Sequence, residues 1–150
     1  MPRLDTKLEA QGAEFLVLGT LLAEGIVAYK TYTNMPGYDL IASNPEGGTS
    51  CRIQVKSRWA TDYDGAFPIK SLESYFVVVV ALNRGYRYSK PRGATDSGRR
   101  APTFYVLPTR VLRRLPRGGT WKKVFLKDVA RVGKYIEAWD LIRKALRPRR

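Results

Sequence analysis

The chain has 150 residues, with 27 lysines and arginines against 13 aspartates and glutamates, for a formal net charge of +14. This length fits one domain with a hydrophobic core, and 44% hydrophobic residues is ordinary globular usage. Histidine is absent and Cys51 is the single cysteine. This composition excludes histidine general-base chemistry, zinc sites built from His or Cys, and an internal disulfide framework.

The longest apolar run, Tyr75–Leu82, has the length of a strand and falls far short of the roughly 20 residues of a membrane span. The first residues, Met1–Lys7, lack the apolar segment of a secretory signal. We therefore expect a cytoplasmic protein that does not enter a membrane, and the single cysteine agrees with a reducing compartment.

The excess of positive charge predicts attraction to a polyanion, and nucleic acid is the commonest such partner. An anionic membrane surface is the less suitable partner, because no long amphipathic helix carries a strongly basic polar face. The plainer interpretation is that a basic surface only keeps the protein soluble.

The first predicted element is an amphipathic helix over Thr6–Glu24, with a capping box from Thr6 and Glu9 and a stop at Gly25. Residues at helical spacing form one stripe: Ala10, Glu14, Val17, Leu18 and Leu21. A carboxylate at Glu14 is costly in such a stripe unless it has a partner.

Alternating or apolar runs then predict strands at Ile26–Thr33, Tyr38–Ser43, Ser50–Arg58, Phe67–Lys70, Tyr75–Leu82 and Thr103–Leu107. A basic helix, Arg110–Leu115, capped by Thr109, and a last helix, Lys134–Leu146, complete the chain. We expect one α/β (α+β) domain over residues 1–150 with helices around a central sheet. A basic loop at residues 90–102 is expected to be mobile, and residues 147–150 form a basic tail.

The predicted strand Ser50–Arg58 separates two kinds of side chain, because side chains alternate along a strand. One face is polar and cationic, with Arg52, Gln54, Lys56 and Arg58, and the other is largely apolar, with Cys51, Ile53, Val55 and Ser57. Asp39 begins the preceding strand, and the turn at Pro45–Gly48 is able to place it beside Gln54.

Glu14, Asp39 and the run Gln54-Val55-Lys56 resemble the PD-(D/E)XK nuclease superfamily, which includes restriction endonucleases, archaeal Holliday-junction resolvases and a homing-endonuclease branch. The strongest resemblance is to group I intron-associated endonucleases, which share the Gln-X-Lys motif, the Tyr38–Ile41 strand and the closing segment Tyr135–Ile142. It spans Lys7 to about Leu146. It implies a restriction-endonuclease-like core with a mixed β-sheet, in a bacterial or phage-like intracellular protein.

The resemblance implies a Mg²⁺-dependent DNA endonuclease that hydrolyses phosphodiester bonds, homing- or restriction-endonuclease-like, with Mn²⁺ as a substitute ion and no nucleotide cofactor. The implied catalytic residues are Glu14, Asp39, Gln54 and Lys56. The implied metal ligands are Asp39, Glu14, Gln54 and the main-chain carbonyl of Val55, while Lys56 orients or activates the attacking water. Because cutting both strands of a duplex needs two sites, we expect a homo-oligomer, a dimer or a tetramer.

Each of these residues also has a plainer interpretation. Asp39 is compatible with a turn residue, Gln54 and Lys56 with the solvent face of an edge strand, and Glu14 with an ion pair to Arg52 or Arg58. Gln54 stands where the family usually has an acid, so a DNA-binding module that has lost its chemistry stays open. A structure-specific, junction-resolvase-like nuclease is the third hypothesis.

Basic side chains are expected to contact DNA phosphates, which give affinity without sequence information. The candidates are Arg52, Arg58, Arg92, Arg99, Arg100, Lys122 and Lys123. A second acidic pair, Asp62 and Asp64, is predicted to serve a turn.

Overall fold

The structure, a computed structural model, describes residues 5–31, 37–63, 65–69, 71–116 and 123–148. The helices are α1 (Thr6–Ala23), α2 (Thr109–Arg113) and α3 (Asp140–Ala145), with short 3₁₀ turns η1 (Leu126–Asp128) and η2 (Val132–Tyr135). The strands are β1 (Val27–Lys30), β2 (Leu40–Asn44), β3 (Thr49–Arg58), β4 (Ala66–Pro68), β5 (Phe76–Ala81), β6 (Thr103–Pro108) and β7 (Lys123–Phe125).

The main sheet has the strand order β1-β2-β3-β5-β6. Strands β1, β2 and β3 are antiparallel neighbours, β3 and β5 are parallel, and β5 and β6 are antiparallel. The sheet is therefore mixed, as predicted. Strand β3 pairs with β2 over Thr49–Ile53 and with β5 over Ile53–Arg58, and Gln54 is buried, so the interpretation of Gln54 as a solvent-facing residue is wrong.

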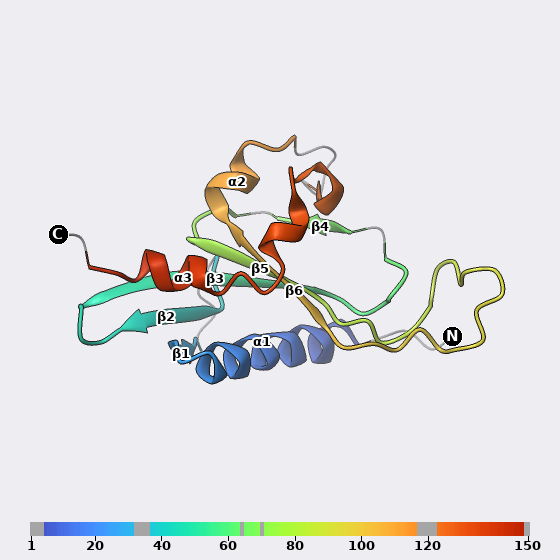
Figure 1. Cartoon of the computed structure of the whole chain (residues 1–150), viewed down its shortest axis with the longest axis horizontal. Helices are drawn as coiled ribbons and strands as arrows, with labels where there is room; N and C mark the ends of the chain where they lie inside the picture. The colour runs from blue at the N-terminus through green and yellow to red at the C-terminus, as the bar shows by residue number, and fades with distance from the viewer. Residues whose placement is uncertain (1–4, 32–36, 64, 70, 117–122, 149–150) are drawn as a thin grey trace.

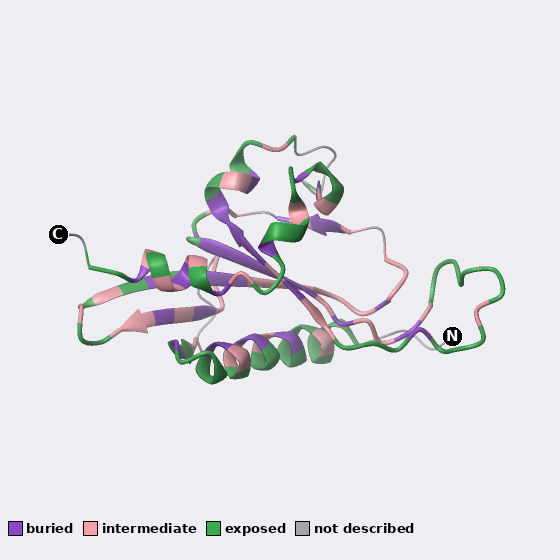
Figure 2. Cartoon of the chain, viewed as in Figure 1, coloured by how far each residue is buried: buried purple, intermediate pink, exposed green. Residues whose placement is uncertain are grey.

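Two hydrophobic clusters cover the two faces of this sheet, which lies between helices α1 and α2 in Figure 1. One face packs against α1 and α3, and its cluster includes Val17, Leu21, Ile53, Val78 and Trp139. The other face packs against α2 and the small β4–β7 sheet, and its cluster includes Ile69, Val77, Val79, Leu107 and Leu112. The central strands are thus buried on both sides, as Figure 2 shows, which explains the apolar β5.

Helix α1 is close to its predicted range, but its cap and its buried stripe differ in detail. The cap is Asp5, not Thr6, because the Asp5 carboxylate accepts from the amides of Lys7 (3.0 Å) and Leu8 (3.2 Å). The buried stripe is Ala13, Val17 and Leu21, while Ala10 is exposed.

The C-terminal half departs further from the prediction. The expected helix Lys134–Leu146 is divided because Ile136 forms a β-bridge with Tyr105 and Glu137 adopts a left-handed φ of 54°. Helix α3 therefore begins at Asp140. Strand β7 was not predicted, since three residues carry no periodic signal.

The connection from β5 to β6 extends away from the sheet and is largely exposed (Figure 2). Its base is tied by main-chain bonds, from Tyr86 N to Ser97 O (3.0 Å) and from Arg100 N to Asn83 O (2.9 Å). Asp62 lies in a turn, and its carboxylate accepts amides of the distant connection that follows Tyr86, while Asp64 lies outside the described residues. Burial raises the pKa of Asp62, but the hydrogen bonds from the amides of residues 87, 89 and 88 together outweigh it and hold the pKa below its ordinary value.

None of the helices in the described parts of the chain is long and apolar enough to cross a membrane.

Candidate active site

The candidate site lies where β2 and β3 separate. The last ladder pair is Leu40 with Ile53. Beyond it, the Asp39 amide donates to the Ile53 carbonyl (2.9 Å), and Asp39 Oδ2 accepts from the Val55 amide (2.8 Å). A side-chain carboxylate thus takes the place of a main-chain acceptor. This bond ties the Asp39 carboxylate to the backbone of β3, which goes beyond the role of a turn residue.

Glu14 reaches the same region from helix α1. Its carboxylate forms an ion pair with Lys30 at the end of β1, and both side chains are mostly buried, with exposed fractions of 18% for Glu14 and 12% for Lys30. The plainer interpretation that Glu14 forms an ion pair with Arg52 or Arg58 is therefore wrong. Lys30 Nζ also lies 5.1 Å from the centre of the Phe15 ring.

Asp39 is the titrating group that links these residues. Burial raises the pKa of Asp39 most, the hydrogen bond from the Val55 amide opposes that rise, and the neighbouring Glu14 carboxylate raises the pKa again. The Lys56 ammonium acts in the opposite direction. The carboxylates of Glu14 and Asp39 and the ammonium of Lys56, three of the four predicted catalytic residues, therefore lie close enough to influence the pKa of Asp39.

Gln54 and Lys56 lie on the sheet face opposite α1, since they are in register with Val77 and Val79 of the second cluster. Gln54 is only 9% exposed. Its Oε1 is buried and finds no hydrogen-bond partner among the described residues. A buried carbonyl oxygen without a donor is costly, so this atom is suited to a ligand.

The predicted ligand residues carry oxygens of the kind that a hard divalent cation takes. They are the carboxylates of Asp39 and Glu14, which influence each other, and the buried amide oxygen of Gln54, which has no partner among the described residues. Carboxylate and carbonyl oxygens are the ligands that Mg²⁺ takes, usually while keeping several waters. Across the described ranges no group of three or more His, Cys, Asp or Glu side chains gathers, so a metal here depends on the neutral oxygens.

The predicted DNA contacts are only partly brought together. Arg52 and Arg58 share the Gln54 face of β3 and stack on aromatic rings, at 4.9 Å from Tyr38 and from Tyr63 respectively. The others lie exposed elsewhere, with Arg92, Arg99 and Arg100 on the β5–β6 connection and Lys123 on β7, and Lys122 lies outside the described residues.

Lys30 is the member of the site that sequence reasoning missed. Its signal was present, because Ile26 and Ala28 are buried and alternation places Lys30 on the same face of the strand. A lysine on a buried strand face and Glu14 in a buried helix stripe each needed a partner. The sequence alone does not show that these two charges pair with each other, because they lie on different elements.

Comparisons with known proteins bear on the fold and the family of this chain. A solved structure of a bacterial homing endonuclease, I-Ssp6803I, superposes with a TM-score of 0.61 over 93% of each chain, at 23% identity. The Holliday junction resolvase Hjc from the archaeal hyperthermophile Archaeoglobus fulgidus covers 81% of this chain and 88% of its own, with a TM-score of 0.48 and 18% identity. The first likeness supports the restriction-endonuclease-like fold. No curated protein sequence matches the chain significantly.

The family model described as PD-(D/E)XK endonuclease matches residues 4–87, which is more than half of the chain. The matched segment holds Glu14, Asp39, Gln54 and Lys56 and runs through strand β5. The chain therefore belongs to the PD-(D/E)XK endonuclease family.

Proposed function

We propose that this protein is a Mg²⁺-dependent DNA endonuclease of the homing- or restriction-endonuclease-like kind, for which Mn²⁺ substitutes. The observation that supports the proposal is the proximity of the Glu14 carboxylate and the Lys56 ammonium to the Asp39 carboxylate, which the Val55 amide holds on β3. The buried Gln54 Oε1, which has no partner among the described residues, is the further oxygen that the proposal uses. Family membership supports a nuclease, and the net charge of +14 supports a nucleic acid substrate.

In this proposal Asp39, Glu14, Gln54 Oε1 and the Val55 carbonyl hold the cation. When bound, the cation neutralises charge on the scissile phosphate and makes water a better nucleophile at neutral pH. Lys56 orients the attacking water and stabilises the negative charge that develops in the transition state. The Val55 amide keeps the Asp39 carboxylate in place through its 2.8 Å hydrogen bond.

Lys30 has a separate task in the proposal. Two carboxylates lie near each other, and the ion pair from Lys30 to Glu14 offsets their repulsion in the metal-free protein. Lys30 is then a positioning residue, because it acts through Glu14.

The direct test is cleavage of supercoiled plasmid in Mg²⁺ and in EDTA. Asp39→Ala and Lys56→Ala are each expected to lower the rate by about 10³-fold, because each removes a group that stabilises charge at the reacting phosphate. Glu46→Gln is the matched control, since Glu46 is an exposed acid in the β2–β3 turn. Wild-type rates in both site variants would contradict the proposal.

One observation keeps a second candidate function in view. Gln54 provides no charge, so a DNA-binding module without chemistry would retain the same fold. Linear, nicked and four-way DNA are the substrates to compare. Binding to any of them with no cleavage in Mg²⁺ or Mn²⁺ identifies the inactive module, and cleavage confined to four-way DNA identifies a junction-resolvase-like nuclease.

We also propose that the protein acts as a homo-oligomer, a dimer or a tetramer, so that two sites reach both strands. Exposed apolar side chains on α1 and the edge strand β1 support this assembly: Leu8, Leu22, Val27 and Tyr29. Sedimentation of the wild type and of Leu22→Glu tests it, with a shift to monomer expected for the variant. Monomeric wild-type protein would contradict the assembly but not the nuclease activity.

A further inference from the structure

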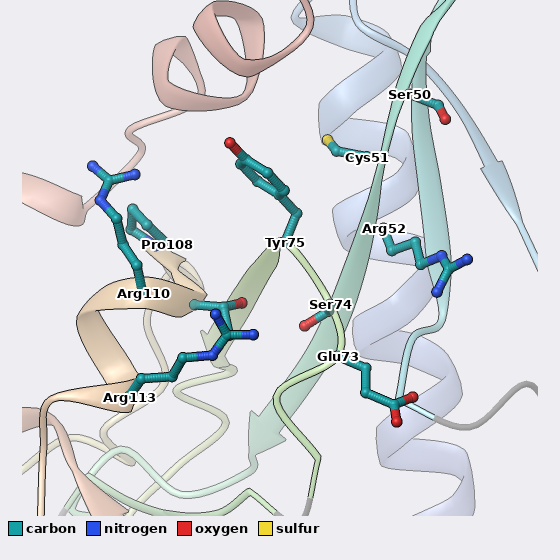
Figure 3. A pocket seen from close by; sticks show the side chains of 10 residues that line it. Ser50, Cys51, Arg52, Glu73, Ser74, Tyr75, Pro108, Arg110 and Arg113 are labelled. Atoms are coloured by element: carbon teal, nitrogen blue, oxygen red, sulfur yellow. The ribbon is translucent and has the colours of Figure 1, made fainter.

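A polar pocket opens near the candidate active site, between strand β3, the start of β5 and helix α2 (Figure 3). Its volume is about 440 Å³. The side chains that decide its chemistry are Arg52, Ser74, Thr109, Arg110, Arg113 and Glu73. Together they come from three separate parts of the chain, so folding builds the pocket.

The walls of this pocket are positively charged. Arg110 and Arg113 lie on the side formed by α2, and Arg52 lies on the opposite side, on β3 (Figure 3). Arg113 is oriented by a hydrogen bond from its Nη2 to the Leu72 carbonyl (2.9 Å). The Glu73 carboxylate points away from α2 (Figure 3). Arg52 also points away from α2 and stacks on Tyr38, so the α2 side of the pocket presents the two guanidinium groups of Arg110 and Arg113, which favour an anion.

Two hydroxyl groups give the pocket its second, independent feature. Ser74 and Thr109 are each only 3% exposed, and neither hydroxyl has a hydrogen-bond partner among the described residues. The Thr109 amide donates to the Tyr75 carbonyl (3.0 Å), so the backbone around both residues is fixed. A hydroxyl rotates to donate to an anion, and a phosphate oxygen accepts such a bond together with those of arginine.

The location of the pocket points to the source of the anion. Arg52 precedes Gln54 by two residues on the same face of β3, which is about 7 Å along a strand. A DNA strand held at the candidate active site therefore continues directly to the pocket. We infer that this pocket binds a non-scissile phosphate of the DNA backbone and fixes the register of the strand on the active site. The inference rests on the proposed function.

The test measures the affinity for a duplex of arbitrary sequence with 5′-hydroxyl ends, in EDTA, as a function of salt. If Arg110 and Arg113 share one phosphate, the double variant Arg110→Gln/Arg113→Gln lowers the slope of log K against log salt by about 0.9 in total. Two independent contacts on a diffuse basic surface would lower it by about 1.8, which would overturn the pocket.

Arg114→Gln is the matched control for the arginine variants. It removes the same charge one residue further along, but Arg114 is exposed and does not line the pocket. We expect Arg113→Gln to weaken binding clearly more than Arg114→Gln does. Equal losses for the two variants would overturn the inference.

The hydroxyl variants supply a readout that a merely structural role does not move. Thr109→Val keeps the side-chain shape and removes an unpaired buried hydroxyl, so it is expected to raise the Tm of the free protein by about 3 °C. It is also expected to weaken duplex binding about tenfold, because the bond to the phosphate is lost. A higher Tm with unchanged affinity would overturn the role of Thr109 in binding.

These measurements separate the inference from the proposed function. They need no cleavage, so a protein that binds through the pocket but never cuts DNA would contradict only the nuclease proposal. A protein that cuts DNA while the pocket variants bind like the wild type would contradict only the inference.

Discussion

The candidate active site, where β2 and β3 separate, and the pocket beside α2 lie two residues apart on one strand, yet they bury opposite kinds of group. The candidate active site buries charges, with Glu14 and Lys30 paired and Asp39 held by the Val55 amide. The pocket buries neutral hydroxyls and leaves its arginines at the rim. A buried charge needs a partner before any ligand arrives, whereas an exposed charge does not.

This difference separates two tasks within one surface. In the proposed function the candidate active site acts on a cation and on charge that develops only during reaction, so its residues are expected to act on kcat. The pocket is arranged around an anion that is present throughout, so its residues are expected to act on KM. Variants on the two sides therefore test whether chemistry and substrate placement are separable.

The largest expected effect is on kcat, from a substitution in the candidate active site. Glu14→Gln removes one of the two carboxylates and is expected to lower kcat for plasmid cleavage in Mg²⁺ about 10²-fold. The KM for DNA should change little, whereas Arg113→Gln should raise KM more than it lowers kcat. Steady-state cleavage kinetics of both variants measure the contrast, and a KM effect of similar size for Glu14→Gln would remove it.

A smaller effect concerns the stability of the metal-free protein. Lys30→Met leaves Glu14 mostly buried beside Asp39 without its partner, which is expected to cost about 2 kcal/mol in the free energy of unfolding. Mg²⁺ should restore part of this loss, since it supplies the missing positive charge. Urea unfolding in EDTA and in Mg²⁺ measures both quantities. Arg110→Gln is the control from the exposed pocket rim, and a loss as large as that of Lys30→Met would argue against the contrast.

The smallest expected effect is the contribution of Asp39 to the pH dependence of the free energy of unfolding. Burial, followed by Glu14, holds the pKa of Asp39 above its ordinary value in the folded protein. Between the unfolded and folded pKa values the folded state carries more protons, so its stability is highest below the unfolded pKa and falls as pH rises to the folded pKa.

Asp39→Asn removes this titration and keeps an oxygen for the Val55 amide. In EDTA the variant is therefore expected to gain stability relative to the wild type as the pH rises through that interval. Thermal unfolding at a series of pH values measures the difference, and a constant difference would show that Asp39 ionises normally.

From the sequence, the residues proposed for the site could be chosen more readily than the contacts between distant parts of the fold. Alternation along β3 predicted which side chains share a face, because a strand imposes a strict period of two. Glu14 was recognisable because a charge in an apolar helix stripe is unusual. The ion pair to Lys30 was not predicted, since the two residues lie on different elements and only packing brings them together.

Features fixed by distant contacts stayed out of reach. The parallel partner of β3 is β5, and nothing local to β3 indicates that it is central in the sheet. Helix α3 is short because Ile136 bridges Tyr105, a contact that a helical pattern around Trp139 conceals. The pocket was missed for the same reason, because Ser74 and Thr109 meet only across the β5–β6 pairing.

Strand β3 also sets the time scale on which this surface can adapt. It has ten residues, it is hydrogen-bonded to strands on both sides, and Asp39 continues its bonding beyond the end of β2. Such a strand opens only when much of the domain unfolds, so its amides should be among the last to exchange with solvent. The candidate active site and the pocket then both lie on a strand that opens slowly. Adjustment to a bent or kinked substrate falls to the exposed connection between β5 and β6 and to the DNA itself.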